Sequence, residues 1–100
     1  MNSTDNVDIR RNLIEVFKDE VPVLRTKARI SQEIVTEKIG VSRQTYSSIE
    51  TGKREMSWTV FLALLAYFQN NGLTRGALSK IDGFEEMVSQ AIDENTKTNS

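Results

Sequence analysis

One stretch in the middle of the chain decides the fold. Residues 31–54 have the sequence SQEIVTEKIGVSRQTYSSIETGKR. Ser31 and Ser42 each precede a short run with helical spacing, and a serine hydroxyl there can accept hydrogen bonds from the free N–H groups of a first helical turn. Gly40 stands between the runs, where glycine can take the left-handed conformation of an abrupt helix end. We therefore predict two short helices, 31–39 and 42–50, joined by a tight turn, which is the layout of a helix-turn-helix.

The second of these helices is predicted to have one inward and one polar face. The inward positions of the pair are Val35, Ile39, Val41, Tyr46 and Ile49. On the opposite face Arg43 pairs with Ser47, and Gln44 with Ser48, at four-residue steps. This face carries no acid, and its guanidinium, carboxamide and hydroxyl groups suit base edges and phosphates.

The remainder of the chain also has helical spacing, with five glycines and one proline. We predict a helix from Asp8 and a second from near Val21, because Pro22 suits a first turn better than a helix interior. One kinked continuous helix is the alternative. Ser57 is expected to cap the most apolar helix, with Trp58 and Tyr46 both in the core. Shorter helices follow at 74–80 and 83–93, whereas residues 1–7 are expected to fray.

These elements predict an all-α bundle of five to six helices. We divide it into a helical extension at residues 1–20, a helix-turn-helix core at 21–70, a C-terminal helical segment at 71–94 and a disordered tail at 95–100.

No run reaches the roughly 20 apolar residues of a membrane span, and the first residues lack the basic start and apolar run of a secretory signal. We expect a cytoplasmic protein that does not enter a membrane.

Charge is distributed unevenly although the net charge is only −1. Residues 24–54 hold seven basic and three acidic side chains, so this third of the chain carries +4. The flanking segments 1–23 and 55–100 carry −2 and −3. We expect an anionic partner to dock on the middle third.

Composition also bears on chemistry. The chain has no cysteine and no histidine, which removes thiolate chemistry, the usual zinc ligands and the commonest general base. No nucleophile–base or carboxylate pair is evident. We expect a protein that is not an enzyme and that needs no metal or cofactor.

The central motif resembles a known family. The run Gly-Val-Ser-Arg-Gln-Thr at 40–45, with Ile-Glu-Thr-Gly-Lys-Arg at 49–54, is similar to the phage repressor and Cro type of helix-turn-helix, the XRE family of transcriptional regulators. The resemblance covers residues 21–70. It implies a five-helix, all-α, lambda-repressor-like DNA-binding domain whose second motif helix enters the major groove of double-stranded DNA.

The resemblance also implies roles for individual residues. Gln32 matches a position that touches the DNA backbone, Lys53 and Arg54 match a phosphate-gripping loop, and Arg25 with Glu50 matches a structural salt bridge. The base-contacting helix supplies the other candidate DNA-binding residues, namely Ser42, Arg43, Gln44, Thr45, Ser47 and Ser48. Thr36 stands where alanine is usual and Met56 where a loop proline is usual, so we expect slightly wider helix packing and a less rigid loop.

We therefore expect a sequence-specific, dimeric repressor. The dimer surface is assigned to the apolar stripe from Phe84 to Ile92, with the Ile9–Phe17 helix as its competitor; the alternative is that the last helix covers its own core. Two other functions remain open. The chain could be the antitoxin of a toxin–antitoxin pair, which would add a toxin as protein partner, or an interaction adaptor that kept the fold without DNA binding.

Overall fold

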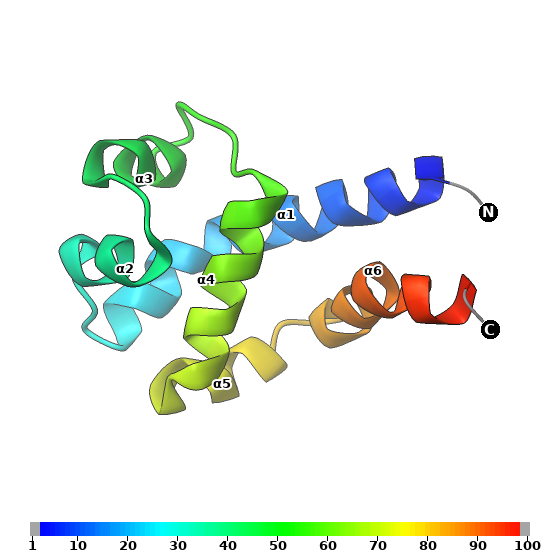
Figure 1. The fold of residues 1–100 in the computed structure, drawn as a ribbon. Helices are drawn as coiled ribbons and strands as arrows, with labels where there is room; N and C mark the ends of the chain where they lie inside the picture. Colours follow the sequence, from blue (N-terminus) through cyan, green and yellow to red (C-terminus); the bar gives the residue numbers. More distant parts are fainter. Residues whose placement is uncertain (1–2, 99–100) are drawn as a thin grey trace.

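The computed structural model describes residues 3–98, with side chains described for residues 8–92, and every regular element in this part is a helix (Figure 1). The elements are α1 (Ser3–Lys27), α2 (Gln32–Ile39), α3 (Arg43–Glu50), α4 (Trp58–Asn70), α5 (Gly72–Ser79) and α6 (Phe84–Thr98). The predicted all-α bundle of five to six helices is confirmed, with six helices in the described residues. Within the described residues no helix is both long and apolar enough to cross a bilayer.

Helix α1 corrects two expectations about the N-terminal third. It runs unbroken from Ser3 to Lys27 with Pro22 in its interior, so the predicted break near Val21 is wrong and the continuous alternative holds. Proline removes one backbone donor, but Val21 and Leu24 on either side of it are 1% and 2% exposed. Their burial in the same core holds both halves in one helix. The expected fraying is also wrong from Ser3 onward, and Met1 and Asn2 lie outside the described residues.

The helix ends follow the capping signals. The Oγ atoms of Ser31, Ser42 and Ser57 accept backbone N–H hydrogen bonds at 3.1, 3.0 and 3.1 Å, each from the residue three positions on. Gly40 ends α2 with φ of 79°, in the left-handed region as predicted. Helix α5 begins at Gly72 instead of residue 74 because the side chain of Asn71 caps it, accepting from the N–H groups of its first turn.

An aromatic cluster forms the centre of the core. Phe17 of α1 lies 5.0 Å from Phe61 of α4 and 5.6 Å from Phe84 of α6, measured between ring centroids. Phe17 and Phe61 are 0% exposed and Phe84 is 1% exposed. Three helices distant in sequence are therefore joined at one point.

This core buries the first residue of the assigned dimer surface. Phe84, and the competing residues Leu13 and Phe17, are all buried within the single chain. The last helix covers its own core, and of its predicted stripe Ile92 alone is exposed, at 44%. Helix α6 also continues to Thr98, so the disordered tail predicted from residue 95 is wrong up to that residue; residues 99–100 lie outside the described part.

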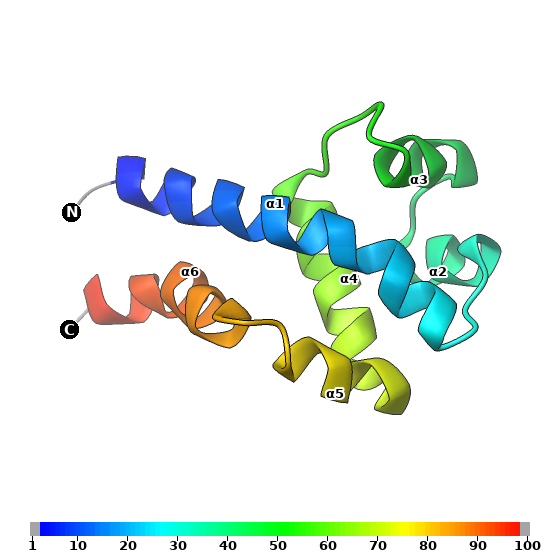
Figure 2. The same cartoon turned by 180° about the vertical axis from the view of Figure 1, so that it is seen from behind.

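The arrangement separates the helix-turn-helix from the chain ends. Helix α1 runs the length of the molecule, with α2 and α3 packed near its C-terminal end (Figure 2). Helix α4 crosses it, and α6 lies beside its N-terminal half (Figures 1 and 2). Both chain ends therefore project away from α3.

Candidate nucleic-acid interface

Helix α3 presents its polar face to solvent. Arg43 and Gln44 are exposed, and Ser47 and Ser48 are half-buried on the same side. They line a shallow hollow, which we call the recognition hollow, and its complete lining is Gln32, Arg43, Gln44, Ser47, Ser48, Thr51 and Lys53. No acidic residue lines it, so a polyanion meets hydrogen-bonding groups and two positive charges there.

The start of α3 is fixed by two hydroxyl side chains. Ser42 Oγ accepts the N–H of Thr45 and donates to Thr45 Oγ1, both at 3.0 Å. Neither residue lines the recognition hollow. The structure therefore gives them a role in holding the helix N-terminus, and their contact with DNA stays a prediction.

A buried carboxylate fixes the other end of α3. Glu50 Oε2 accepts from Arg25 Nε at 2.8 Å and from the hydroxyl of Tyr46. Its Oε1 accepts from Arg25 Nη2 at 3.1 Å and from Gln32 Nε2 at 3.0 Å. These four residues, the Glu50 network, join α1, α2 and α3, and four hydrogen bonds occupy about the full capacity of a carboxylate. The predicted salt bridge between Arg25 and Glu50 is present.

The network shifts the pKa of each titratable member. Burial alone would raise the pKa of Glu50, but the hydrogen bonds from Arg25, Tyr46 and Gln32 outweigh it and lower that pKa. Burial, together with the hydrogen bond to Glu50, raises the pKa of the Tyr46 hydroxyl far above its usual value. The hydrogen bond to Glu50 also raises the pKa of Arg25. At neutral pH the network is an ion pair with a neutral phenol.

Four other positions that the sequence analysis singled out lie in or beside the core. Tyr46 is 0% and Met56 6% exposed, so a buried side chain ties the α3–α4 loop to the core where a proline was expected. Thr36 is 6% exposed, and its hydroxyl donates to a backbone carbonyl three residues earlier at 2.9 Å. Trp58 is only half-buried, but it stacks on Phe61 at 4.8 Å between ring centroids.

A family model described as a helix-turn-helix domain matches residues 20–78, more than half of the chain. The chain belongs to the helix-turn-helix domain family. Searches among curated proteins and among solved structures gave no match. Membership indicates DNA binding and, with it, regulation of transcription. The matched segment starts inside α1 and ends in α5, so it contains the recognition hollow and the whole Glu50 network.

In this helix-turn-helix protein, Gln32 belongs both to the Glu50 network and to the lining of the recognition hollow. Its amide nitrogen donates one hydrogen to Glu50 and has a second hydrogen left, on the edge of the recognition hollow. The predicted contact of Gln32 with the DNA backbone is therefore compatible with its structural role in the Glu50 network. Thr51 also lines the hollow and was missed by the sequence analysis. It lies four residues after Ser47, so helical spacing could have found it.

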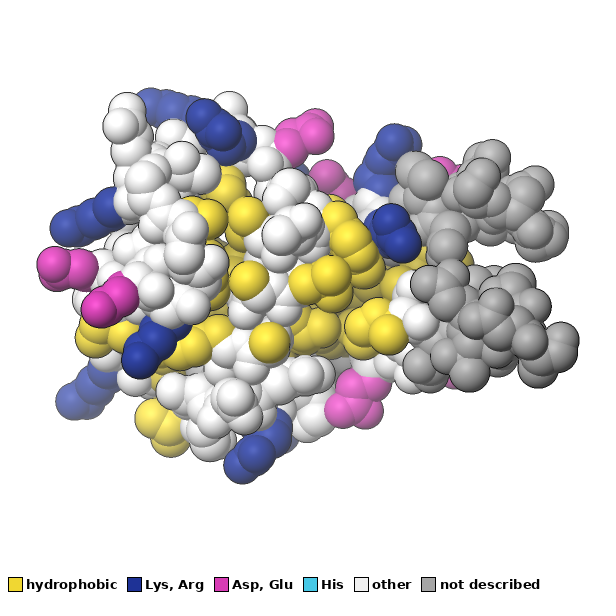
Figure 3. All heavy atoms as spheres, in the orientation of Figure 1, with side chains coloured by type: hydrophobic (Ala, Val, Ile, Leu, Met, Phe, Trp, Pro, Cys, Tyr) yellow, Lys and Arg dark blue, Asp and Glu magenta, His cyan; other side chains and the backbone are white. Residues whose placement is uncertain are grey.

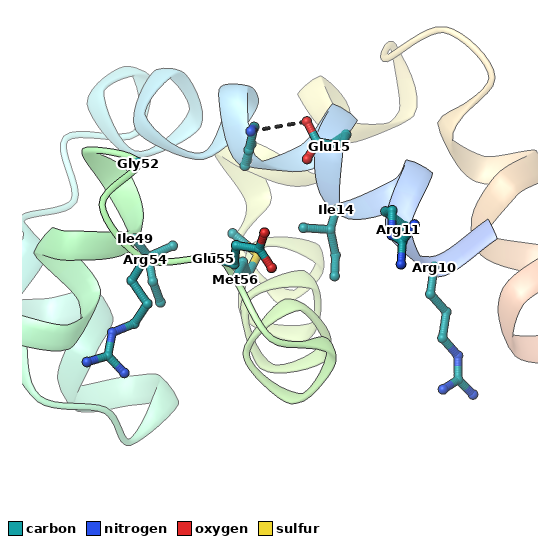
Figure 4. Close-up of a pocket in the computed structure, with 10 residues that line it drawn as sticks. Arg10, Arg11, Ile14, Glu15, Ile49, Gly52, Arg54, Glu55 and Met56 are labelled. Atoms are coloured by element: carbon teal, nitrogen blue, oxygen red, sulfur yellow. Dashed lines mark ion pairs between the residues drawn. The ribbon is translucent and has the colours of Figure 1, made fainter. Parts of the chain in front are cut away.

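Lys53 and Arg54 were predicted to bind phosphate together, but their side chains line two different hollows. Their backbone N–H groups both donate to the carbonyl of Ser48, at 2.9 and 3.1 Å, after Gly52 turns the chain with φ of 83°. Lys53 lines the recognition hollow, whereas Arg54 lines a second hollow beside α1 (Figure 4). Only their side chains are free to contact phosphate.

Proposed function

We propose that this helix-turn-helix protein is a sequence-specific, dimeric repressor that places α3 in the major groove of double-stranded DNA. The observation that supports this most strongly is the acid-free lining of the recognition hollow around Arg43 and Gln44. In this proposal the protein works in the cytoplasm, occupies its DNA site non-covalently and catalyses no reaction.

The chemistry of the hollow favours direct base contact. An arginine can donate two hydrogen bonds to guanine, and a glutamine can pair with adenine through both its donor and its acceptor. Ser47 and Ser48 are small, so they let the backbone of α3 approach the groove floor. The Glu50 network holds α3 at a fixed angle to α1 and α2, and this supports selectivity because a misaligned side chain cannot form both bonds.

Selection of bound sequences from randomised duplex DNA tests this proposal. We expect a consensus site, and Arg43→Ala should lose about 1–3 kcal/mol of binding free energy per half-site and relax the preference at one base position. Lys53→Ala should instead weaken all sequences about equally. Arg75→Ala is the matched control, because Arg75 is exposed on α5 and lies outside the hollow. Equal weakening of every sequence by Arg43→Ala would make it a phosphate contact and transfer base contact to Gln44 and Ser48.

The dimer is proposed from the symmetry that paired half-sites require. Helix-turn-helix dimers contact two half-sites about 34–36 Å apart, one turn of DNA. With Phe84, Leu13 and Phe17 buried, the exposed apolar side chains are the next candidates. They include Leu73 at 72%, Leu62 at 37% and Ile92, the exposed end of the predicted stripe, at 44%. Hydrophobic side chains also gather over α4 and on the side of it toward α6 (Figure 3). A palindromic consensus and a dimer mass in sedimentation would support the proposal, and a monomer on a non-palindromic site would contradict it.

A further inference from the structure

A second hollow lies between α1 and the loop that joins α3 to α4. It has a volume of about 290 Å³, and the residues that matter to the argument are Arg10, Arg11, Arg54 and Glu55 at its rim (Figure 4). We call it the arginine groove. It shares the loop 51–56 with the recognition hollow, because Lys53 lines one and Arg54 the other.

Among the residues whose side chains the structure describes, most of the positive charge in the arginine groove has no acidic partner. Lys18 also lines it but forms an ion pair with Glu15, at 3.1 Å, so these two charges cancel. Among the described residues, the three arginines form no ion pair, which leaves Glu55 as the one unpaired acid of the lining. Within the part of the chain that the structure describes, three guanidinium groups without an ion pair stand beside one carboxylate, and this favours an anionic ligand.

The arginines are also arranged for an extended anion. The guanidinium of Arg10 lies over the ring of Trp58, with its carbon 5.0 Å from the ring centroid. Stacking of this kind orients the planar group. In Figure 4 the side chains of Arg10 and Arg54 extend to the same side, with α4 between them. Two separated cations on one side match a chain of phosphates better than one small ion.

Two of the three apolar residues that line the groove belong to the core. Ile49 and Met56 line it, but each is only 6% exposed because both belong to the core. Ile14 is the third apolar lining residue and is half-buried. Ile49 and Met56 therefore offer almost no surface to a partner, and the groups that distinguish this groove as a binding surface are its charged side chains.

We propose that Arg10 and Arg11, together with Arg54, bind backbone phosphates of the duplex outside the half-site that α3 contacts. The inference rests on the proposed function, since it extends the footprint of the same bound DNA. It assigns a DNA contact to α1, upstream of the segment matched by the family model.

Two duplexes carrying the selected site test this inference. One is trimmed to the two half-sites, and the other carries one further helical turn, about 10 base pairs, on each side. The wild-type protein should bind the flanked duplex more tightly. The double variant Arg10→Gln/Arg11→Gln should lose most of this preference, because only Arg54 still contacts the flanking phosphates. Its log–log salt slope on the flanked duplex should fall by about 0.9 for each phosphate that the variant no longer neutralises. Arg75→Gln, which removes one positive charge on α5 as Arg11→Gln does on α1, should keep the wild-type preference and slope.

Two further variants test the inference without removing the stacking of Arg10 on Trp58, whose loss could disturb folding. Arg11→Gln alone changes an exposed side chain and should lower the slope by about 0.9. Glu55→Gln removes the opposing carboxylate and should strengthen binding of the flanked duplex only. If the arginine variants keep the wild-type flank preference and slope, the inference is wrong and the groove serves another partner, while the proposed function stands. If the wild-type protein binds neither duplex, the proposed function itself fails.

Discussion

Truncation of Arg25 to alanine should destabilise the fold far more than loss of a surface charge. The guanidinium donates two hydrogen bonds to Glu50, at 2.8 and 3.1 Å, and a third to the carbonyl of Ile30 at 3.0 Å. Arg25→Ala removes all three and leaves the carboxylate of Glu50 without a cation. Because the Glu50 side chain is only 8% exposed, water cannot replace the missing guanidinium fully.

The expected cost follows from this burial. Removing one partner of a buried ion pair costs about 3–5 kcal/mol, whereas an exposed pair is worth about 0–1 kcal/mol. The Arg25 side chain is 18% exposed, and Gln32 and Tyr46 continue to donate to Glu50. We therefore expect the lower end, about 3 kcal/mol, in the free energy of unfolding. For a domain of this size that corresponds to a fall in Tm on the order of 15 °C.

Urea unfolding at neutral pH, followed by far-ultraviolet circular dichroism, measures this cost. Lys27→Ala is the control, because Lys27 is exposed and lies in the same last turn of α1. The double variant Arg25→Ala/Glu50→Gln should be more stable than Arg25→Ala alone, since it no longer buries an unpaired charge. A loss below about 1 kcal/mol, similar to that of Lys27→Ala, would refute the reasoning and make the pair a solvated one.

Substitutions at three further positions test other parts of the structure. Tyr46→Phe should lower the free energy of unfolding by about 1.5 kcal/mol, measured by the same urea titration, because a hydrogen bond to a charged group is removed; an unchanged value would mean that the phenol contributes nothing. Glu50 has its pKa lowered below 4.5 in the folded state, so its stabilising effect is complete above that value and is lost as the pH falls through the lowered pKa. The stability difference between wild type and Glu50→Gln should therefore shrink in acid, and a pH-independent difference would contradict the assignment. Arg29 has a positive φ of 58° after α1, so Arg29→Gly should raise stability by about 1 kcal/mol and Arg29→Ala should not; equal effects of the two would show that the conformation is not strained.

The helix-turn-helix could be predicted closely because its signals are local. A serine cap acts within three residues, and the left-handed Gly40 acts at its own position, so each feature needs no distant partner. The same holds for the pairing of side chains along α3, which placed Arg43, Gln44, Ser47 and Ser48 on one face. Spacing along a helix is a property of the chain itself.

Other features depended on tertiary contacts and were mispredicted. Pro22 has a local preference for a helix start, but burial of Val21 and Leu24 overrides it. The stripe at Phe84 predicted an exposed interface because sequence spacing identifies an apolar face without telling what covers it. In the fold, α1 covers it, and the contact between Phe17 and Phe84 spans most of the chain.

Charge shows the same distinction between sequence and space. The +4 of residues 24–54 includes Arg25 and Glu50, whose charges cancel inside the Glu50 network, so the charge available to DNA comes from other side chains. The net acidic segment 1–23 in turn supplies Arg10 and Arg11 to a groove that borders the recognition loop. The continuous helix α1 supplies charged side chains to both sites. It places Arg25 at the base of α3 and holds Arg10 against Trp58 at the start of α4. Electrostatic attraction to a duplex depends on which side of the molecule the charges occupy, so the slightly negative net charge is compatible with DNA binding.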